Sequence, residues 1–270
     1  MKNITEAPFL TEIMRITANM YRLGWDERNS GNISFLLDEK ETGEYLAPGA
    51  VKRTFPLNFD AQALAGKIFL VTGTGKYFKN VQYNPEENLG IVRISADGKS
   101  ADLLWGFSGG ASPTSEFSVH LMCHTARLKL NPANRIIMHA HPANLIAMTY
   151  IHSIDEKEFT RTLWQFCIEG IVVFPEGIAV LPWMLCGTNE IAEATAKKME
   201  DFRLVVWSMH GIFGAGNSFD EAFGLIETAE KAAEIYLKTA HLPRLSIPSD
   251  AQIIALAEKW NANYRKDWLG

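Results

Sequence analysis

Two spacings of apolar residues alternate along the chain and predict an α/β protein. Between Thr5 and Gly24, apolar side chains recur every three or four residues, which predicts a helix that ends at Gly24. The same spacing predicts helices at 117–128, 143–150, 156–166, 188–199, 218–241 and 249–264. A capping box at Ser218 and Glu221 marks the start of the longest one.

Short apolar runs between these helices predict the strands. We expect strands at 33–37, 67–72, 89–95, 101–105, 135–141, 169–174, 177–181 and 203–210. The sequence Asp97-Gly98 separates two of these runs and is a hairpin signal, so the sheet is at least partly antiparallel. Residues 38–66 show only a weak pattern and predict a loop-rich excursion with one short helix near Gln62. With no repeat and no interior linker, residues 1–270 are expected to form a single domain.

Composition narrows the function without choosing it. The 270 residues contain 47 % hydrophobic and 21 % charged residues, which is ordinary for a soluble globular protein. The net charge of −5 and the lack of a long basic run argue against nucleic acid as a partner, although a local patch can still bind a phosphorylated metabolite. No apolar run is long enough for a membrane span or a signal peptide, so we expect no membrane partner and a cytoplasmic protein. The widely spaced Cys123, Cys167 and Cys186 predict free thiols.

The histidines suggest a metal site. His139 and His141 are two residues apart in a predicted strand, so both imidazoles lie on one face and can bind the same ion, although core histidines bonded to backbone would show the same pattern. His210 ends another apolar run. Three imidazoles with one open position are typical of catalytic zinc, with Glu116 as a fourth candidate, but hydrolases and cupins also have this pattern. The remaining histidines, His120, His124, His152 and His241, lie on helices or helix ends and are expected to face packing or solvent.

Three polar turns lie where strands or helices begin or end. Residues 29–32 precede a strand, residues 73–76 follow one, and residues 112–116 open a helix with Thr114 or Ser115 as N-cap. Each turn can present amides and hydroxyls to an anion, and each also has an ordinary structural interpretation. The spacing at 73–76 is not that of a P-loop. For Glu169, a solvated cap and a catalytic acid both remain open.

Five short motifs together resemble the zinc-dependent class II sugar-phosphate aldolase and epimerase family. They are Gly-Asn-Ile-Ser at 31–34, Thr-Gly-Thr-Gly-Lys at 72–76, Pro-Thr-Ser-Glu at 113–116, His-Ala-His-Pro at 139–142 and Met-His-Gly at 209–211. The resemblance runs nearly end to end and implies one three-layer α/β domain, with a mixed, largely antiparallel sheet covered by helices on both faces. The segments 24–29, 75–81 and 38–66 resemble the branch of the family that acts on L-rhamnulose 1-phosphate.

By matching motif, the resemblance also implies roles for individual residues. His139, His141 and His210 would bind one zinc ion per subunit, and Glu116 would be the catalytic carboxylate, which can also ligate zinc in the empty enzyme. Glu169 would handle the proton of the C4 hydroxyl. The phosphate of the sugar would be surrounded by Asn29, Asn32, Thr74, Gly75, Thr114 and Ser115. The expected reaction is cleavage to dihydroxyacetone phosphate and L-lactaldehyde in rhamnose degradation, by a homotetramer with active sites near subunit interfaces.

Other functions remain to be weighed against this one. Within the family, the alternatives are an L-fuculose-phosphate aldolase and an L-ribulose-5-phosphate 4-epimerase. A non-catalytic, adducin-like protein-binding domain would have lost the metal histidines, and all three are present. Lysine Schiff-base chemistry is the competing aldolase mechanism, but Lys76 lies in a polar turn that the resemblance assigns to phosphate, so it receives no catalytic role.

Overall fold

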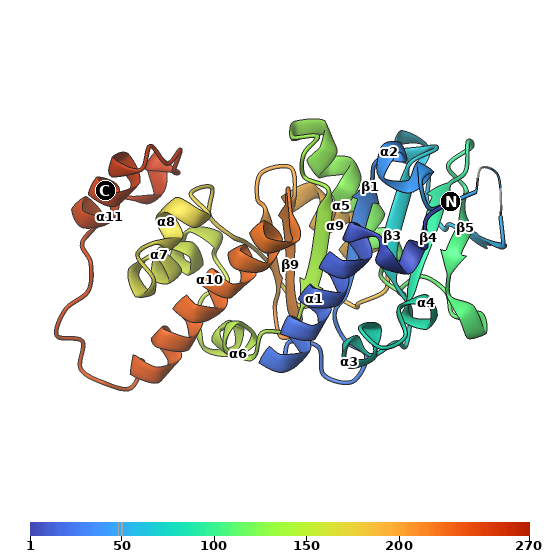
Figure 1. The fold of residues 1–270 in the computed structure, drawn as a ribbon. Coiled ribbons are helices and arrows are strands. Elements are labelled where there is room, and N and C mark those ends of the chain that lie inside the picture. Colours follow the sequence, from blue (N-terminus) through green and yellow to red (C-terminus); the bar gives the residue numbers. More distant parts are fainter. Residues whose placement is uncertain (48, 50) are drawn as a thin grey trace.

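The centre of the fold is one nine-stranded sheet (Figure 1). The computed structural model describes residues 1–47, 49 and 51–270. The strands are β1 Asn32–Leu37, β2 Arg53–Pro56, β3 Ile68–Thr72, β4 Leu89–Ile94, β5 Ser100–Gly106, β6 Ile136–Ala140, β7 Ala179–Leu181, β8 Leu204–Trp207 and β9 Gly211–Gly216, in the order β2-β5-β4-β3-β1-β6-β9-β8-β7. Among the strand pairs of the described residues, only β7–β8 is parallel, which confirms the predicted mixed, largely antiparallel sheet.

Helices cover the sheet. They are α1 Pro8–Leu23, α2 Glu39–Gly43, α3 Phe78–Val81, α4 Pro85–Asn88, α5 Phe117–Leu130, α6 Ala143–Ile151, α7 Glu156–Phe166, α8 Gly170–Val173, α9 Asn189–Lys198, α10 Phe219–Thr239 and α11 Asp250–Lys259. Short 3-10 helices lie at Ile4–Glu6, Gln62–Leu64, Ser108–Gly110 and Lys266–Trp268. The long helices predicted from apolar spacing are confirmed, and Gly24 ends α1 in the left-handed conformation at φ 73°. No helix in the described part of the chain has the length and apolarity that a bilayer crossing requires.

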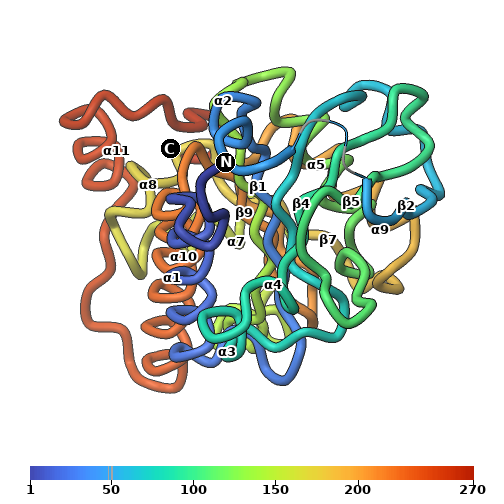
Figure 2. The backbone as a smooth tube through the Cα atoms, turned by 45° about the vertical axis from the view of Figure 1, so that its right-hand side comes forward, coloured from blue at the N-terminus to red at the C-terminus, as the bar shows by residue number. Residues whose placement is uncertain are grey.

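The helices form two layers, one on each face of the sheet. Figures 1 and 2 both show α1 and α10 side by side. On β9, Phe213 contacts the ring of His120 on α5, whereas a Cβ at Gly214 would meet Ile226 on α10 at 3.1 Å. Because neighbouring residues of a strand point to opposite faces, α5 and α10 lie on opposite sides of the sheet, and the predicted three-layer architecture is confirmed.

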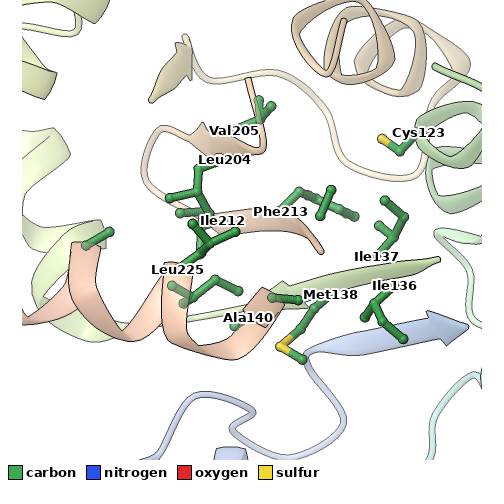
Figure 3. Close-up of a cluster of buried hydrophobic side chains, with 14 of the residues drawn as sticks. Cys123, Ile136, Ile137, Met138, Ala140, Leu204, Val205, Ile212, Phe213 and Leu225 are labelled. Atoms are coloured by element: carbon green, nitrogen blue, oxygen red, sulfur yellow. The ribbon is translucent and has the colours of Figure 1, made fainter. Parts of the chain in front are cut away.

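The middle of the sheet is buried on both faces. Every residue of β6 and β9 is buried. In the close-up of Figure 3, side chains of β6, β8 and β9 fill the core between Leu225 of α10 and Cys123 of α5. Strands covered on both faces are apolar throughout, which explains the continuous runs in the sequence. A histidine in such a strand is necessarily buried, and His139 is 1 % exposed.

The strand predicted at 169–174 is wrong. Residues Gly170–Val173 form one helical turn, α8, in which Val172 and Val173 donate to the carbonyl of Glu169. The turn packs between α10 and α11, with Ile171 fully buried. An apolar run this short has no period that separates a buried strand from a buried helix, so tertiary packing decided between them.

The strand predicted to end at His210 is confirmed as β8, but the glycine-rich stretch that follows it was not predicted to form a strand. The two segments form an antiparallel hairpin, β8 and β9, in which Trp207 pairs with Gly211. Met209 lies in the turn with φ 64°, a conformation that is uncommon for a residue with a side chain and so leaves no sequence signal. As a consequence, His210 lies on a turn between two central strands.

The excursion at 38–66 contains more structure than predicted. The short 3-10 helix at Gln62–Leu64 agrees with the expected helix near Gln62, but α2 and the edge strand β2 were missed. Two positions of this segment, 48 and 50, lie outside the described residues. The three cysteines are free, as predicted.

Candidate metal centre and active site

Most of the predicted site residues surround one cavity of about 150 Å³. The cavity lies at the end of the sheet where β3 and β6 end and β1 begins, the lower end in Figure 1. Its lining residues are Asn29, Ser30, Gly31, Asn32, Gly73, Thr74, Gly75, Thr114, Ser115, Glu116, His139, His141, Cys186 and His210. Because β1 is antiparallel to both β3 and β6, the start of β1 lies beside the ends of β3 and β6. These segments therefore meet at one end of the sheet although they are far apart in the chain.

The three predicted metal ligands converge. One nitrogen from each of His139, His141 and His210 lies within 4.8 Å of the other two. The Nδ1 of His139 lies 3.0 Å from the carbonyl oxygen of Ile212, and the Nδ1 of His141 lies 2.9 Å from Oε1 of Glu27. Both acceptors require a proton on Nδ1, so in the neutral rings each Nε2 keeps its lone pair.

This arrangement fits a divalent cation. The Nε2 atoms of His139 and His141 are 3.1 Å apart, and two bare lone pairs at that distance repel unless a cation lies between them. Burial holds the pKa of His139 well below its ordinary value, and burial, aided by His141, lowers the pKa of His210 to about 4. Neutral imidazoles with free lone pairs are the form that binds metal.

Glu116 lies beside the imidazoles as a buried carboxylate. It is 7 % exposed, and its Oε2 lies 3.7 Å from Nε2 of His139. Asn32 donates to the same oxygen at 2.8 Å. Burial raises the pKa of Glu116, and the hydrogen bond from Asn32 opposes this rise. A raised pKa favours a carboxyl that can take up a proton and release it, as an acid–base catalyst must.

The start of α5 differs from the prediction. We expected Thr114 or Ser115 as the N-cap, but Glu116 occupies that position, and its side chain makes no capping hydrogen bond. Instead, Oγ1 of Thr114 accepts from the backbone N–H of Glu116 at 3.3 Å. The carboxylate of Glu116 therefore does not cap the helix, and it lines the cavity.

The part of the cavity wall formed by the turns at residues 29–32 and 73–76 is polar and small. Thr74 donates its backbone N–H to the carbonyl of Ser112 at 2.9 Å, so its hydroxyl is the group that it can offer to a ligand. Gly75 turns the chain with φ 68°, and Gly31 does so with φ 70°. A Cβ at Gly31 would lie 3.3 Å from the carbonyl of His139, so glycine also permits this loop to pack closely against β6. Phosphate binding by this wall stays a prediction.

Two predicted residues have unexpected positions. Asn32 lies 8 % exposed, and its side-chain amide joins Glu116 to His120. Glu169 is the N-cap of α8 and does not line the cavity, so one chain does not bring it to Glu116. Lys76 pairs with Glu87 at 2.8 Å, in keeping with its lack of a catalytic assignment.

Sequence reasoning missed two residues with evident roles. Glu27 accepts from His141 and thereby fixes the tautomer of a candidate ligand. Cys186 reaches the cavity from the loop after β7. Neither had a signal in the sequence, because a lone carboxylate after a helix and a lone cysteine in a loop are common.

Comparisons with known proteins agree with this geometry. The model of the class II aldolase and adducin N-terminal domain matches residues 11–237. The rhamnulose-1-phosphate aldolase of Listeria monocytogenes serotype 4a is 54 % identical over 99 % of this chain and 98 % of the relative. The rhamnulose-1-phosphate aldolase of Escherichia fergusonii is 43 % identical over 96 % of both chains. A solved sugar-phosphate aldolase from Thermotoga maritima is 30 % identical with a TM-score of 0.75, covering 88 % of this chain and 97 % of its own. The chain therefore belongs to the class II aldolase and adducin N-terminal domain family.

Proposed function

We propose that this protein is a metal-dependent aldolase that reversibly cleaves L-rhamnulose 1-phosphate to dihydroxyacetone phosphate and L-lactaldehyde. One observation carries the proposal: three converging imidazoles, a buried carboxylate and three polar turns share a single cavity. The names of the relatives, at 43–54 % identity over nearly the whole chain, support the choice of substrate.

The polar turns supply the binding step. Hydroxyls of Thr74, Thr114 and Ser115 and the glycine turn at Gly75 line one wall of the cavity. Small donors at a glycine turn and a helix start suit a phosphate dianion without a buried lysine. A phosphate held there would place the carbon chain of the sugar near Glu116 and the imidazoles, which line the same cavity.

Glu116 carries the proton transfer at carbon. Cleavage begins when the C4 hydroxyl loses its proton; its electrons form the aldehyde carbonyl, and the electrons of the C3–C4 bond remain on the fragment that becomes dihydroxyacetone phosphate. Glu116 then gives its proton to C3 and becomes a carboxylate, and in the reverse direction it takes that proton back. The raised pKa and the hydrogen bond from Asn32 suit a group that alternates between the two forms.

His139, His141 and His210 would hold one zinc ion per subunit. A zinc ion bound there would supply Lewis-acid stabilisation of the negative charge that develops during cleavage, a contribution of several kcal/mol. The chain's own part is to orient His139 through the carbonyl of Ile212 and His141 through Glu27, and to keep His139 and His210 neutral by burial.

The position of Glu169 supports an oligomer. Because this residue lies outside the cavity of its own chain, it can handle the C4 hydroxyl proton only in the site of an adjacent copy. We propose a homotetramer with active sites near subunit interfaces, acting in the cytoplasm in rhamnose degradation.

The direct test compares aldol cleavage of L-rhamnulose 1-phosphate and L-fuculose 1-phosphate, with coupled detection of dihydroxyacetone phosphate. We expect cleavage of the rhamnulose ester, its loss after chelation and its return with zinc. Preference for the fuculose ester would keep the reaction and change the substrate. A folded, metal-loaded protein that cleaves neither ester would refute the proposal.

A further inference from the structure

A row of buried polar side chains extends from Glu116 into the core, and the chemistry above does not use it. Asn32 donates to Glu116 and contacts His120 through its amide oxygen. His120 in turn lies 2.7 Å from the hydroxyl of Ser34 through Nδ1, and the same hydroxyl lies 2.8 Å from Nε2 of His124. Ser34 and both rings are completely buried. These links form one unbranched row of five side chains.

The row follows from two matching repeats. Glu116, His120 and His124 are spaced four residues apart at the start and along one face of α5, which separates them by about 6 Å along the axis. Asn32 and Ser34 are two residues apart on one face of β1, a separation of about 6.6–6.8 Å. Since the two repeats nearly match, side chains of the helix and the strand alternate along the row.

The chemistry of each atom fixes the direction of the hydrogen bonds. The amide of Asn32 gives its NH2 group to Glu116, so its oxygen faces His120 and needs a donor. Nε2 of His120 must therefore carry the proton. Burial lowers the pKa of His120 to about 3, so the ring is neutral and its Nδ1 is bare.

The bare Nδ1 then determines the rest of the row. The hydroxyl of Ser34 donates to Nδ1 of His120, so its oxygen accepts from Nε2–H of His124. Nδ1 of His124 has no hydrogen-bond partner in the described part of the chain, and burial holds the pKa of this ring well below its usual value. Every donor in the row therefore points toward Glu116.

We propose that His120, Ser34 and His124 are positioning residues for Glu116, which act by locking the amide of Asn32 with its NH2 group toward the carboxylate. The inference rests on the proposed function for the role of Glu116, but the hydrogen-bond direction does not depend on it. An amide has a donor end and an acceptor end of nearly equal shape. If Asn32 were free to rotate by half a turn, its oxygen would face the carboxylate and repel it. Aligned hydrogen bonds in a core of low dielectric polarise one another, so each link strengthens the next.

The hydrogen-bond direction is tested first by NMR of protein labelled with ¹⁵N-histidine, without substrate. We expect His120 and His124 to be neutral Nε2–H tautomers at about pH 6, where an ordinary histidine with a pKa of about 6.5 is mostly charged. The variant Ser34→Ala should change the ¹⁵N shifts of both rings. A proton on Nδ1 of His120 would overturn the proposal, whatever the activity of the protein.

The effect on Glu116 is tested by kinetics. In D2O, exchange of a carbon-bound hydrogen of dihydroxyacetone phosphate isolates the proton transfer assigned to Glu116 from cleavage of the C3–C4 bond. For His120→Leu we expect kcat and the exchange rate to fall together by about 10–100-fold, the usual range for residues that orient a ligand or catalyst, with little change in KM. His120→Gln keeps an N–H donor near Asn32 and should recover most of the loss. The effect should decline along the row, from His120→Leu to Ser34→Ala to His124→Leu.

The matched control is Thr17→Val, which removes another fully buried hydroxyl, bonded only within α1. It should lower stability without lowering kcat. Equal losses of kcat in Thr17→Val and Ser34→Ala, or an equal loss in His120→Gln and His120→Leu, would refute a positioning role. If the wild type cleaves and exchanges nothing, the proposed function fails, while the tautomers still decide the direction of the row.

Discussion

His139 and His120 both contact the ring of Phe213 and differ in what their nitrogens face. Both are buried, both have a pKa that burial holds low, and both rings contact the ring of Phe213. His120 uses both nitrogens in hydrogen bonds to side chains. His139 uses Nδ1 on a backbone carbonyl and turns Nε2 to Nε2 of His141, and one nitrogen of His210 lies within 4.8 Å of both rings' ligand nitrogens.

The difference shows that burial and neutrality do not make a histidine a metal ligand. A ligand needs a lone pair that the protein leaves unused and that points to the same place as others. The trio His139, His141 and His210 meets this condition, and the pair His120 and His124 does not. The trio can hold an ion, whereas the pair is hydrogen-bonded to side chains.

The largest effect should come from removing one member of the trio. His210→Ala should release the metal and lower kcat at least about a thousandfold, because several kcal/mol of charge stabilisation depend on the ion. Metal content is measured by elemental analysis beside the cleavage rate. The matched control is His152→Gln, a histidine bonded to Thr162 away from the cavity, which should keep both metal and activity. One full metal equivalent in active His210→Ala would contradict the assignment.

Metal removal should also distinguish the histidine trio from the pair His120 and His124, because only the trio should respond to it. An ion present at about 100 times its Kd adds about 2.7 kcal/mol to the folded state, so chelation should lower the thermal midpoint by several degrees. The ¹⁵N signals of His139, His141 and His210 should move on chelation, while His120 and His124 keep their tautomers. A midpoint unchanged after proven metal loss would show that the trio does not couple metal binding to folding.

Breaking the row of hydrogen bonds through Ser34 should lower stability by a smaller amount. Ser34→Ala leaves the Nε2–H of His124 and the Nδ1 of His120 without partners, which costs about 1–3 kcal/mol of unfolding free energy in a buried site. Urea unfolding of this variant, beside Thr17→Val, measures the difference. A loss smaller than that of Thr17→Val would mean that the two rings find new partners.

The smallest effect concerns the buried carboxylate of Asp26, which belongs neither to the histidine trio nor to the internal row. Both carboxylate oxygens of Asp26 lack partners in the described part of the chain, and burial, aided by the charge of Glu27, raises its pKa to about 7. The folded state therefore holds a proton that the unfolded state has already lost above its pKa of 3.8, so stability falls as pH rises from about 4 to 7 and then levels off. Asp26→Asn removes this dependence.

At pH 8 the variant Asp26→Asn should be more stable than the wild type by about 1–3 kcal/mol, the cost of an unpaired buried polar group, and at pH 5 the gap should shrink. Thermal unfolding at the two pH values measures it. An equal difference in stability between variant and wild type at the two pH values would show that Asp26 is ionised at both.

The sequence by itself determined those features that follow from the periodicity of a single helix or strand. Apolar spacing fixed the long helices and most strands, and the two-residue spacing put His139 and His141 on one face. It failed at 169–174, where a short apolar run has no distinctive spacing, and it missed the strand β9 that follows the turn at Met209. The prediction that His120 and His124 face packing or solvent missed their hydrogen bonds for a different reason, since their partners lie on another element.

Only the tertiary structure decided which faces meet. The pairing of β1 with β6 sets Asn32 opposite His139, and the β8–β9 turn brings His210 to the same edge. Packing of α5 on the sheet joins His120 to Asn32 and Ser34. The periodicity of a helix or strand shows which of its faces a residue occupies. Which other element packs against that face depends on how the whole core is buried. The candidate ligands could therefore be named from the sequence, whereas the row that holds Glu116 could not.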